Sequence, residues 1–189
     1  MQRVKCFAPI ADAKAHILIL GSMPGTASLA AGQYYAHPQN QFWRILGEVT
    51  GADPLSSYAA RTQALKSCGI ALWDVLESCA REGSLDADID EATLHANDFV
   101  SFYRAHPRIA QVFFNGAKAE ACYRKQVQPA LADGIGPRSR MRLPSTSPAN
   151  ASMPRERKRG AWTQALRLAL SANRGGNTDK KMSDPPAGR

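Results

Sequence analysis

The sequence predicts an α/β domain with a central, mainly parallel four-stranded sheet. Two observations support this fold class. Short apolar runs alternate along the chain with longer segments whose apolar residues recur at helical spacing, and such alternation is typical of parallel sheets. The chain has 189 residues, of which 44% are hydrophobic, and this is enough for one domain with a full core. We therefore expect a single folded domain over residues 1–172.

Four apolar runs are the expected strands, and four segments with helical periodicity are the expected helices. The run AHILIL ends at Gly21, and Phe42 and Ile45 lie on one face of a helix. Pro107 ends one predicted helix and Pro154 begins another, since proline suits a first helical turn but interrupts a helix interior. The expected strands are residues 15–20, 69–76, 109–116 and 140–145, and the expected helices are residues 40–49, 91–107, 117–127 and 154–172.

Composition and the last residues predict the general class of protein. Residues 173–189 are polar and rich in glycine and proline, which predicts a disordered tail. No apolar run reaches membrane-spanning length, and the N-terminus has no signal-peptide pattern, so a soluble, cytoplasmic monomer is expected. The four cysteines are scattered, and none lies near a histidine, so we expect buried thiols, no metal and no cofactor.

Charge is distributed unevenly along the chain. The net charge is +8 and the isoelectric point is near 9.6. Residues 137–160 are rich in arginine, whereas residues 77–98 are mostly acidic. This asymmetry favours one face that binds a polyanion. From charge alone, a solvated basic loop is an equally good interpretation.

Polar motifs lie at the ends of the predicted strands. GSMPG (residues 21–25) follows the first strand, Asp74 lies in the second, Asn115 ends the third, and LPSTSPANA (residues 143–151) follows the start of the fourth. Ligands of parallel sheets bind beyond the carboxyl ends of the strands, so these motifs are expected to meet. Each motif alone has an ordinary explanation as a turn, a buried carboxylate with a partner, or a helix cap. GSMPG is not a phosphate loop, because neither GK[ST] nor GxGxxG is present.

Four segments, taken together and in this order, resemble the uracil-DNA glycosylase superfamily. They are ILGSMPG, YYAHPQNQFW, FFNGAKA and LPSTSPANA. AHPQNQFW and FNG are similar to its mismatch-specific uracil/thymine branch. GSMPG and STSPANA are more similar to its hypoxanthine-DNA glycosylase branch. The resemblance covers roughly residues 15–170. It implies a three-layer α/β/α domain that flips a damaged base out of duplex DNA. Such a domain hydrolyses the bond between base and sugar with water, without a metal and without nicking the backbone.

The resemblance also implies residue roles. It places the catalytic amide at Asn40 and a base-stacking ring at Tyr35, whereas His37 is expected to be structural. Asp74 falls where some members have a base-reading asparagine, and Asn115 matches an amide at a strand end. The expected base-binding residues are Tyr35, Asp74, Asn115, Gly21, Ser22 and Met23. The expected DNA-binding residues are Ser145, Ser147, Ala149, Asn150, Arg155, Arg157 and Lys158.

Three positions depart from the family pattern. Met23 stands where many relatives have a water-positioning Asp or Asn. Leu143 replaces a histidine or asparagine of the last motif. Ala149 is small where a relative inserts a larger wedge. Leu143 therefore offers no acid or oxyanion donor, and Ala149 does not favour a strong side-chain plug.

The expected function is therefore a monofunctional DNA glycosylase of base excision repair, nucleoid-associated when acting, that removes hypoxanthine from deoxyinosine. One alternative removes uracil, or mismatched thymine or uracil opposite guanine. Another alternative, from a different class, is a non-catalytic nucleic-acid-binding module of the same fold, which the departures at Met23 and Leu143 favour.

Overall fold

The structure, a computed structural model, describes residues 2–82 and 88–175. The final helix ends at Gly175, three residues beyond its predicted end. The rest of the predicted disordered tail, from residue 176 onward, lies outside the described residues. No helix among the described residues is long and apolar enough to cross a membrane.

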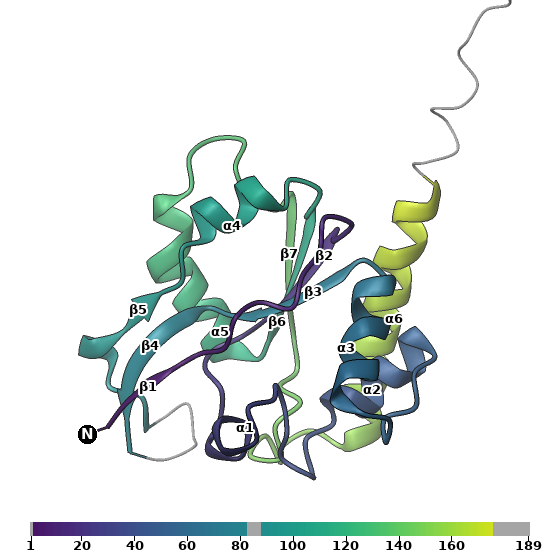
Figure 1. Ribbon diagram of the computed structural model, residues 1–189, viewed down its shortest axis with the longest axis horizontal. Coiled ribbons are helices and arrows are strands. Elements are labelled where there is room, and N and C mark those ends of the chain that lie inside the picture. Colours follow the sequence, from purple (N-terminus) through teal and green to yellow (C-terminus); the bar gives the residue numbers. More distant parts are fainter. Residues whose placement is uncertain (1, 83–87, 176–189) are drawn as a thin grey trace, which may run out of the picture.

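Four strands form the main sheet in the order β3-β2-β6-β7, and all neighbouring pairs are parallel. The predicted four-stranded parallel sheet is thereby confirmed. β2 is buried along its whole length, as expected for an aliphatic strand that is covered on both faces. The strands, which lie centrally in Figure 1, are β2 (Ile17–Gly21), β3 (Ile70–Asp74), β6 (Gln111–Asn115) and β7 (Ser139–Leu143).

A second, antiparallel sheet in the order β1-β4-β5 was not predicted. The predicted strand over residues 69–76 is divided between the two sheets. Most of it is β3, its last residue begins β4, and Val75 lies between the two strands. The Val75 N–H donates to the Gly21 carbonyl at 2.9 Å, and this bond lies where the chain leaves β2. The strands of this sheet are β1 (Gln2–Lys5), β4 (Leu76–Arg81) and β5 (His95–Ala96).

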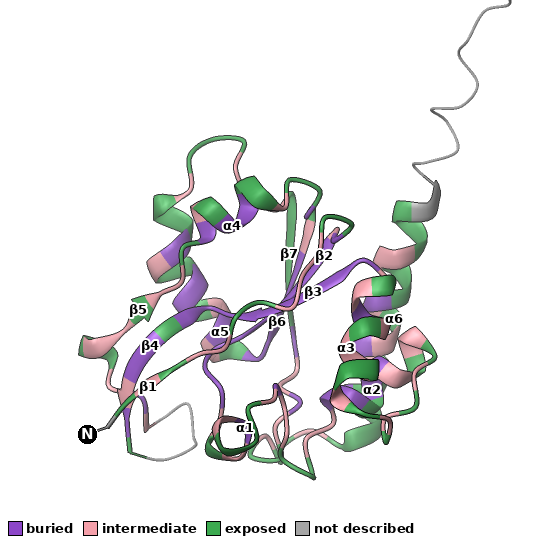
Figure 2. Ribbon diagram, viewed as in Figure 1, coloured by how far each residue is buried: buried purple, intermediate pink, exposed green. Residues whose placement is uncertain are grey.

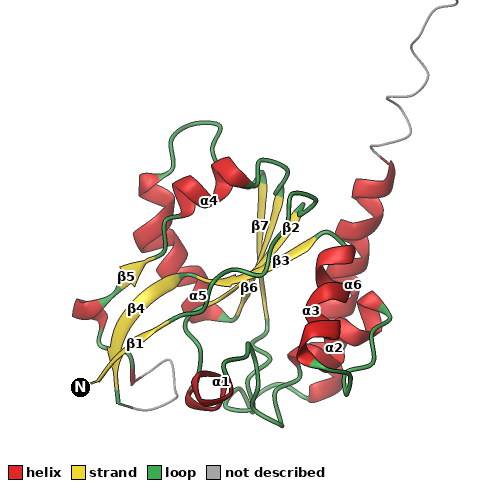
Figure 3. Cartoon of the chain, in the orientation of Figure 1, coloured by secondary structure: helices red, strands yellow, loops and turns green. Residues whose placement is uncertain are grey.

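Helices cover both faces of the main sheet, and the predicted three-layer α/β/α arrangement is confirmed (Figures 1 and 3). One side carries α2 (Phe42–Thr50), α3 (Tyr58–Ser67) and α6 (Arg155–Gly175). The other side carries α4 (Phe99–Ala105) and α5 (Ala117–Cys122), which continues as a π-helical turn over Tyr123–Val127 and a 3₁₀ turn over Gln128–Ala130. The short helix α1 (Thr26–Ala31) follows β2.

Aromatic contacts pack elements against one another on both sides of the sheet. On one side the rings of Phe42 and Trp162 meet edge to face, with centroids 6.4 Å apart. On the other side Phe114 packs against Tyr123 at 5.1 Å. The buried hydrophobic residues form one cluster, and Figure 2 shows the buried colour along β2 and β3 and on parts of the helices.

The predicted helix over residues 91–107 is wrong in its first half. A 3₁₀ turn spans Glu91–Thr93, β5 follows, and α4 begins only at Phe99. Asp98 caps this helix by accepting a hydrogen bond from the Ser101 N–H at 3.0 Å. The Asn97 amide donates to the Asp74 carbonyl at 2.8 Å. This bond joins residues far apart in the sequence and keeps Asn97 outside a helix. The periodicity of residues 91–107 alone therefore could not show where the helix begins.

All four cysteines are thiols. Cys79 and Cys122 are buried as expected, whereas Cys6 and Cys68 are only partly buried. Burial raises the pKa of the Cys6 thiol to about 11, although the Asn97 side chain that bonds its sulfur opposes this rise.

Cys6 is therefore expected to react slowly with alkylating reagents. At pH 8 a thiol with a pKa near 11 carries about 100-fold less thiolate than an ordinary cysteine, and the thiolate is the nucleophile. The measurement is the rate of Cys6 carbamidomethylation by iodoacetamide, followed by mass spectrometry, with a cysteine-containing peptide as reference. A Cys6 rate equal to that of the peptide would contradict this assignment.

Candidate functional site: a pocket at the carboxyl ends of the strands

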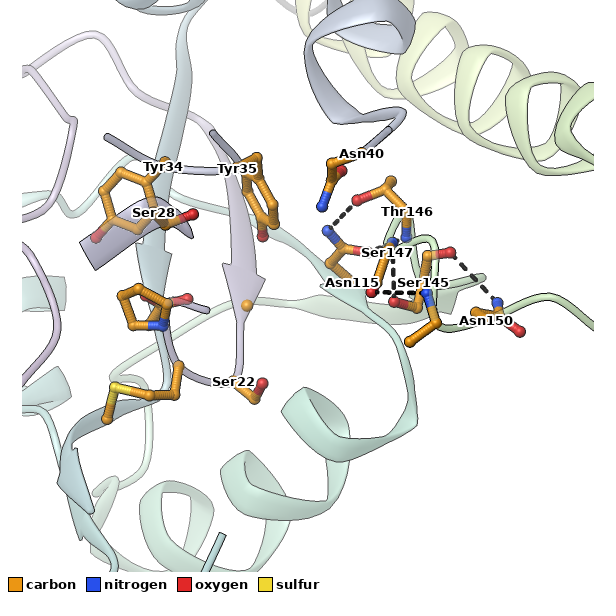
Figure 4. Close-up of a pocket in the computed structure, with 15 residues that line it drawn as sticks. Ser22, Ser28, Tyr34, Tyr35, Asn40, Asn115, Ser145, Thr146, Ser147 and Asn150 are labelled. Atoms are coloured by element: carbon orange, nitrogen blue, oxygen red, sulfur yellow. Dashed lines mark hydrogen bonds between the residues drawn. The ribbon is translucent and has the colours of Figure 1, made fainter. Parts of the chain in front are cut away.

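A pocket of about 400 Å³ opens at the carboxyl ends of the parallel strands, a volume suited to a small flat ligand. The strand register sets up its floor, because Gly21 lies beside Asp74 and Asn115 lies beside Leu143. Eleven of the residues expected from the sequence line this pocket: Gly21, Ser22, Met23, Tyr35, Asn40, Asp74, Asn115, Ser145, Ser147, Ala149 and Asn150. Figure 4 shows how most of them surround the cavity.

Tyr35 forms one wall of the pocket. Its φ of 54° is left-handed, a conformation that tyrosine rarely adopts and that costs about 1–2 kcal/mol. The ring stacks on Phe42, with centroids 4.0 Å apart and an interplanar angle of 25°. Phe42 is itself fully buried, so one face of Tyr35 rests on the core and its edge reaches the pocket (Figure 4).

A turn around Pro38 positions Asn40. The Asn40 N–H donates to the His37 carbonyl at 2.9 Å, and proline is favoured at the second position of such a turn. Asn40 Oδ1 accepts from the Phe42 N–H at 3.0 Å, at the start of α2. Because this bond engages the amide oxygen, the amide nitrogen is the group turned toward the pocket. His37 is exposed, and its Nδ1 accepts from the Gln39 N–H, consistent with a structural residue.

Asp74 and Gly21 form the floor. Asp74 is 3% exposed. An added Cβ at Gly21 would overlap Asp74 Oδ1 and lie 2.9 Å from the Tyr35 hydroxyl. The two side chains therefore converge over a glycine that leaves room for them. Burial raises the pKa of the neighbouring Tyr34 phenol, and the charge of Asp74 adds to that rise, so Tyr34 stays protonated.

The loop after β2 is held from outside the pocket. Arg81 of β4 is buried and donates from Nη2 to the Pro24 carbonyl at 2.6 Å. Met23 is 7% exposed and lines the pocket. Its thioether supplies an apolar wall at the position where the family pattern has a water-positioning Asp or Asn. Arg81 was not predicted, because β4 itself was not.

Asn115 is engaged by the loop that follows β7. Its Nδ2 donates to Thr146 Oγ1 at 2.9 Å, and its Oδ1 accepts from the Thr146 N–H at 2.8 Å. The Thr146 carbonyl in turn accepts from the Gln41 N–H at 3.1 Å. Asn115 lines the pocket, yet both ends of its amide hold Thr146, so the structure favours a positioning role over the expected base contact. Thr146 is fully buried and was not singled out, because nothing in the loop sequence distinguishes it from its neighbouring serines.

Replacing Asn115 with alanine is expected to destabilise the fold by about 1–3 kcal/mol, because it leaves a buried N–H and a buried hydroxyl without their partner. Thr146→Val removes only the hydroxyl bond and should cost less. Urea unfolding followed by tryptophan fluorescence measures both changes. An Asn115→Ala protein as stable as the wild type would contradict the described clamp.

The loop over residues 144–151 is internally bonded. The Ser147 N–H donates to Ser145 Oγ at 3.3 Å, and Asn150 Nδ2 donates to the Ser145 carbonyl at 3.3 Å.

Arg155 and Arg157 are exposed on α6, as expected for residues that face a polyanion. Lys158 departs from this expectation: it is 4% exposed, and its ammonium donates to the Ser147 and Asn150 carbonyls.

The site has no obvious place for a metal, since no group of three or more His, Cys, Asp or Glu lies together within residues 2–82 and 88–175. The chemistry available there comes from amides, one buried carboxylate, hydroxyls and backbone groups. Such groups can stabilise a leaving group and orient a water molecule. Leu143 is buried and lies outside the pocket lining.

The fold and the pocket together define a class of protein. The chain matches the uracil DNA glycosylase superfamily over residues 8–170, and it belongs to that superfamily. The match spans the main sheet, helices α1 to α5, most of α6 and the pocket.

Individual relatives agree with this assignment. The chain is 38% identical to a hypoxanthine DNA glycosylase of Methanosarcina barkeri and 35% identical to one of Methanosarcina acetivorans. Each alignment covers 162 residues, which is 85% of this chain and 96% of the relative. A solution NMR structure of a provisionally assigned uracil DNA glycosylase from Methanosarcina acetivorans superimposes with a TM-score of 0.73. It is 31% identical and covers 89% of this chain and 99% of that one.

Proposed function

We propose that this protein is a monofunctional DNA glycosylase that removes hypoxanthine from deoxyinosine in DNA. One observation carries the proposal: Tyr35, Asn40, Asp74 and the 144–151 loop meet in a single pocket at the carboxyl ends of the sheet. Its relatives in two Methanosarcina species are named hypoxanthine DNA glycosylases. The substrate in this proposal is a base that has been turned out of the duplex, because an enzyme that acts on a base inside a duplex has to take it out of the stack to reach it.

The pocket offers complementary groups to hypoxanthine. The base has a donor at N1–H and an acceptor at O6. Asp74, as a carboxylate, accepts from N1–H, and the Asn40 amide donates toward O6 or a ring nitrogen. Tyr35 supports the face or edge of the ring, and stacking of this kind contributes about 1–3 kcal/mol in single-strand binders.

Hydrolysis requires this site to stabilise the departing base, to stabilise the sugar and to hold a water molecule. The water oxygen bonds to C1′ and the water gives up one proton, while the C1′–N9 bond breaks, its bonding electrons leave with the base, and the base takes up one proton. An amide donor from Asn40 stabilises negative charge on the departing base, and Asp74 balances the positive charge that develops on the sugar by its field. Met23 keeps that side of the pocket apolar, so the water is held by neighbouring amides, hydroxyls or backbone groups.

DNA enters against the 144–151 loop. Ser145 and Ser147 supply hydroxyl groups for phosphates, and the exposed guanidinium groups of Arg155 and Arg157 add charge attraction. Ala149 and Asn150 lie at the pocket rim, next to the gap that the flipped base leaves. Because DNA is the substrate, we extend the proposal to a cytoplasmic monomer that associates with the nucleoid when acting.

The alternative substrates remain part of the test. Uracil also carries an N–H that Asp74 can accept, and the superfamily is named for uracil. Wild-type protein would be incubated with labelled duplexes that carry one deoxyinosine, one uracil or one thymine opposite guanine, and then treated with hot alkali. Alkali-dependent cleavage mainly at deoxyinosine is expected. Cleavage mainly at uracil or thymine would assign that base as the substrate. The absence of an alkali-labile site on every duplex would favour the non-catalytic binding module.

A further inference from the structure

The helix α6 holds the DNA-facing loop from behind by two side chains. Lys158 Nζ donates to the Ser147 carbonyl at 3.4 Å and also to the Asn150 carbonyl. Trp162 Nε1 donates to the Pro144 carbonyl at 2.8 Å. Lys158 and Trp162 are four residues apart and therefore lie on one face of the helix. Both are buried, at 4% and 0% exposure, so neither is a surface group.

We infer that Lys158 is a positioning residue of the proposed glycosylase reaction, which fixes the shape of the 144–151 loop, and that it is not a phosphate contact. The inference rests on the proposed function. It also corrects the expectation from the sequence, where Lys158 follows two exposed arginines and reads as part of the same basic patch.

The geometry shows what the lysine does to the loop. In a trans peptide unit the carbonyl and the N–H point in opposite directions. The Asn150 carbonyl is bonded to Lys158 inside the protein, so the Ala151 N–H of the same peptide unit is directed away from α6. Ala151 is exposed. The buried ammonium therefore turns a backbone donor toward the side of the loop that DNA approaches, where such donors bind phosphate oxygens.

The charge of Lys158 suits this task. One ammonium has three N–H donors, and two of them reach carbonyl oxygens at the two ends of the Pro148–Ala149 tip. Desolvation by burial lowers the pKa of Lys158, and the nearby charge of Arg155 lowers it further.

Salt dependence distinguishes a phosphate contact from a positioning residue. Each phosphate that a side chain neutralises contributes about 0.9 to the slope of log affinity against log salt concentration in duplex DNA. Binding of wild type, Lys158→Met and Arg157→Met to a deoxyinosine duplex would be measured by fluorescence anisotropy over a series of salt concentrations. We expect Arg157→Met to lower the slope by about one unit and Lys158→Met to leave it unchanged.

Activity supplies the second readout. Misplacement of a loop by about 1 Å can cost on the order of 100-fold in rate, so Lys158→Met is expected to lower kcat/KM by about 10- to 100-fold. Lys158→Arg keeps a cationic donor and should recover part of this loss. Trp162→Phe removes only the indole donor, keeps an aromatic ring in the core, and is expected to reduce kcat/KM without changing the salt slope. This variant keeps the test decisive if Lys158→Met does not fold.

Two results would overturn the inference. A Lys158→Met slope that falls as far as that of Arg157→Met would make Lys158 a phosphate contact. Wild-type kcat/KM in both Lys158→Met and Trp162→Phe would show that the loop does not depend on this support. Failure of the proposed function looks different, because wild-type protein itself would then release no base from any duplex.

Discussion

Asn40→Ala is expected to slow base removal by about 10²–10³-fold, the usual effect of deleting one well-placed donor from an active site. Asn40 Oδ1 is bonded to the Phe42 N–H at 3.0 Å, so the amide nitrogen faces the pocket beside Tyr35 (Figure 4). The predicted loss concerns the chemical step. Affinity for deoxyinosine DNA should change little, because the loop and the basic face of α6 remain. Single-turnover release of hypoxanthine from a labelled duplex measures the rate.

The aspartate variant separates the two ends of the amide. Asn40→Asp keeps an oxygen for the Phe42 N–H, so its stability should stay near wild type, whereas Asn40→Ala loses this hydrogen bond, which is worth about 1 kcal/mol. The same aspartate lacks the donor, so its rate should fall as far as that of the alanine variant. Gln39→Ala changes an exposed neighbour and serves as the matched control. Wild-type activity in Asn40→Asp would assign an acceptor role to this side chain and contradict the donor mechanism.

The parts of the site that could be predicted from the sequence are those that strand topology brings together. Parallel strands share one carboxyl edge, so residues that end successive strands meet whatever their detailed packing. Gly21, Asp74 and Asn115 meet in this way. Tyr35 and Asn40 were expected from the resemblance to the uracil-DNA glycosylase superfamily, and the chain before α2 brings both to the pocket.

The parts that could not be predicted depend on contacts between distant segments. Lys158 reads as one more basic residue of an exposed patch, and only the packing of α6 behind the loop makes it a buried donor. Thr146 has the same chemistry as its neighbouring serines, and its burial follows from Asn115 and Gln41 together. The division of residues 69–76 between two sheets likewise requires the pairing of β1 with β4.

Gly21→Ala is expected to abolish most of the activity through the shape of the pocket floor. The added Cβ would overlap Asp74 Oδ1 and approach the Tyr35 hydroxyl to 2.9 Å. Asp74 is buried at 3% exposure, so it cannot swing into solvent, and the carboxylate or the ring must move into the space that the base needs. Overpacking of this kind costs about 1–3 kcal/mol of stability. The loss of activity should be larger, on the order of 100-fold for a misplacement of about 1 Å.

Gly25→Ala is the matched control, because it adds the same methyl group four residues further along the chain, where the loop after β2 meets α1. No atom lies within 4 Å of a Cβ at Gly25, and its φ of −73° is one that alanine adopts freely. Its only expected cost is that of a poorer helix cap, below about 1 kcal/mol. Single-turnover assays and urea unfolding of both variants therefore separate a change at the floor from a change anywhere in the loop. Equal activity of the two variants would mean that Asp74 and Tyr35 do not have to hold their positions over Gly21 for the base to be removed.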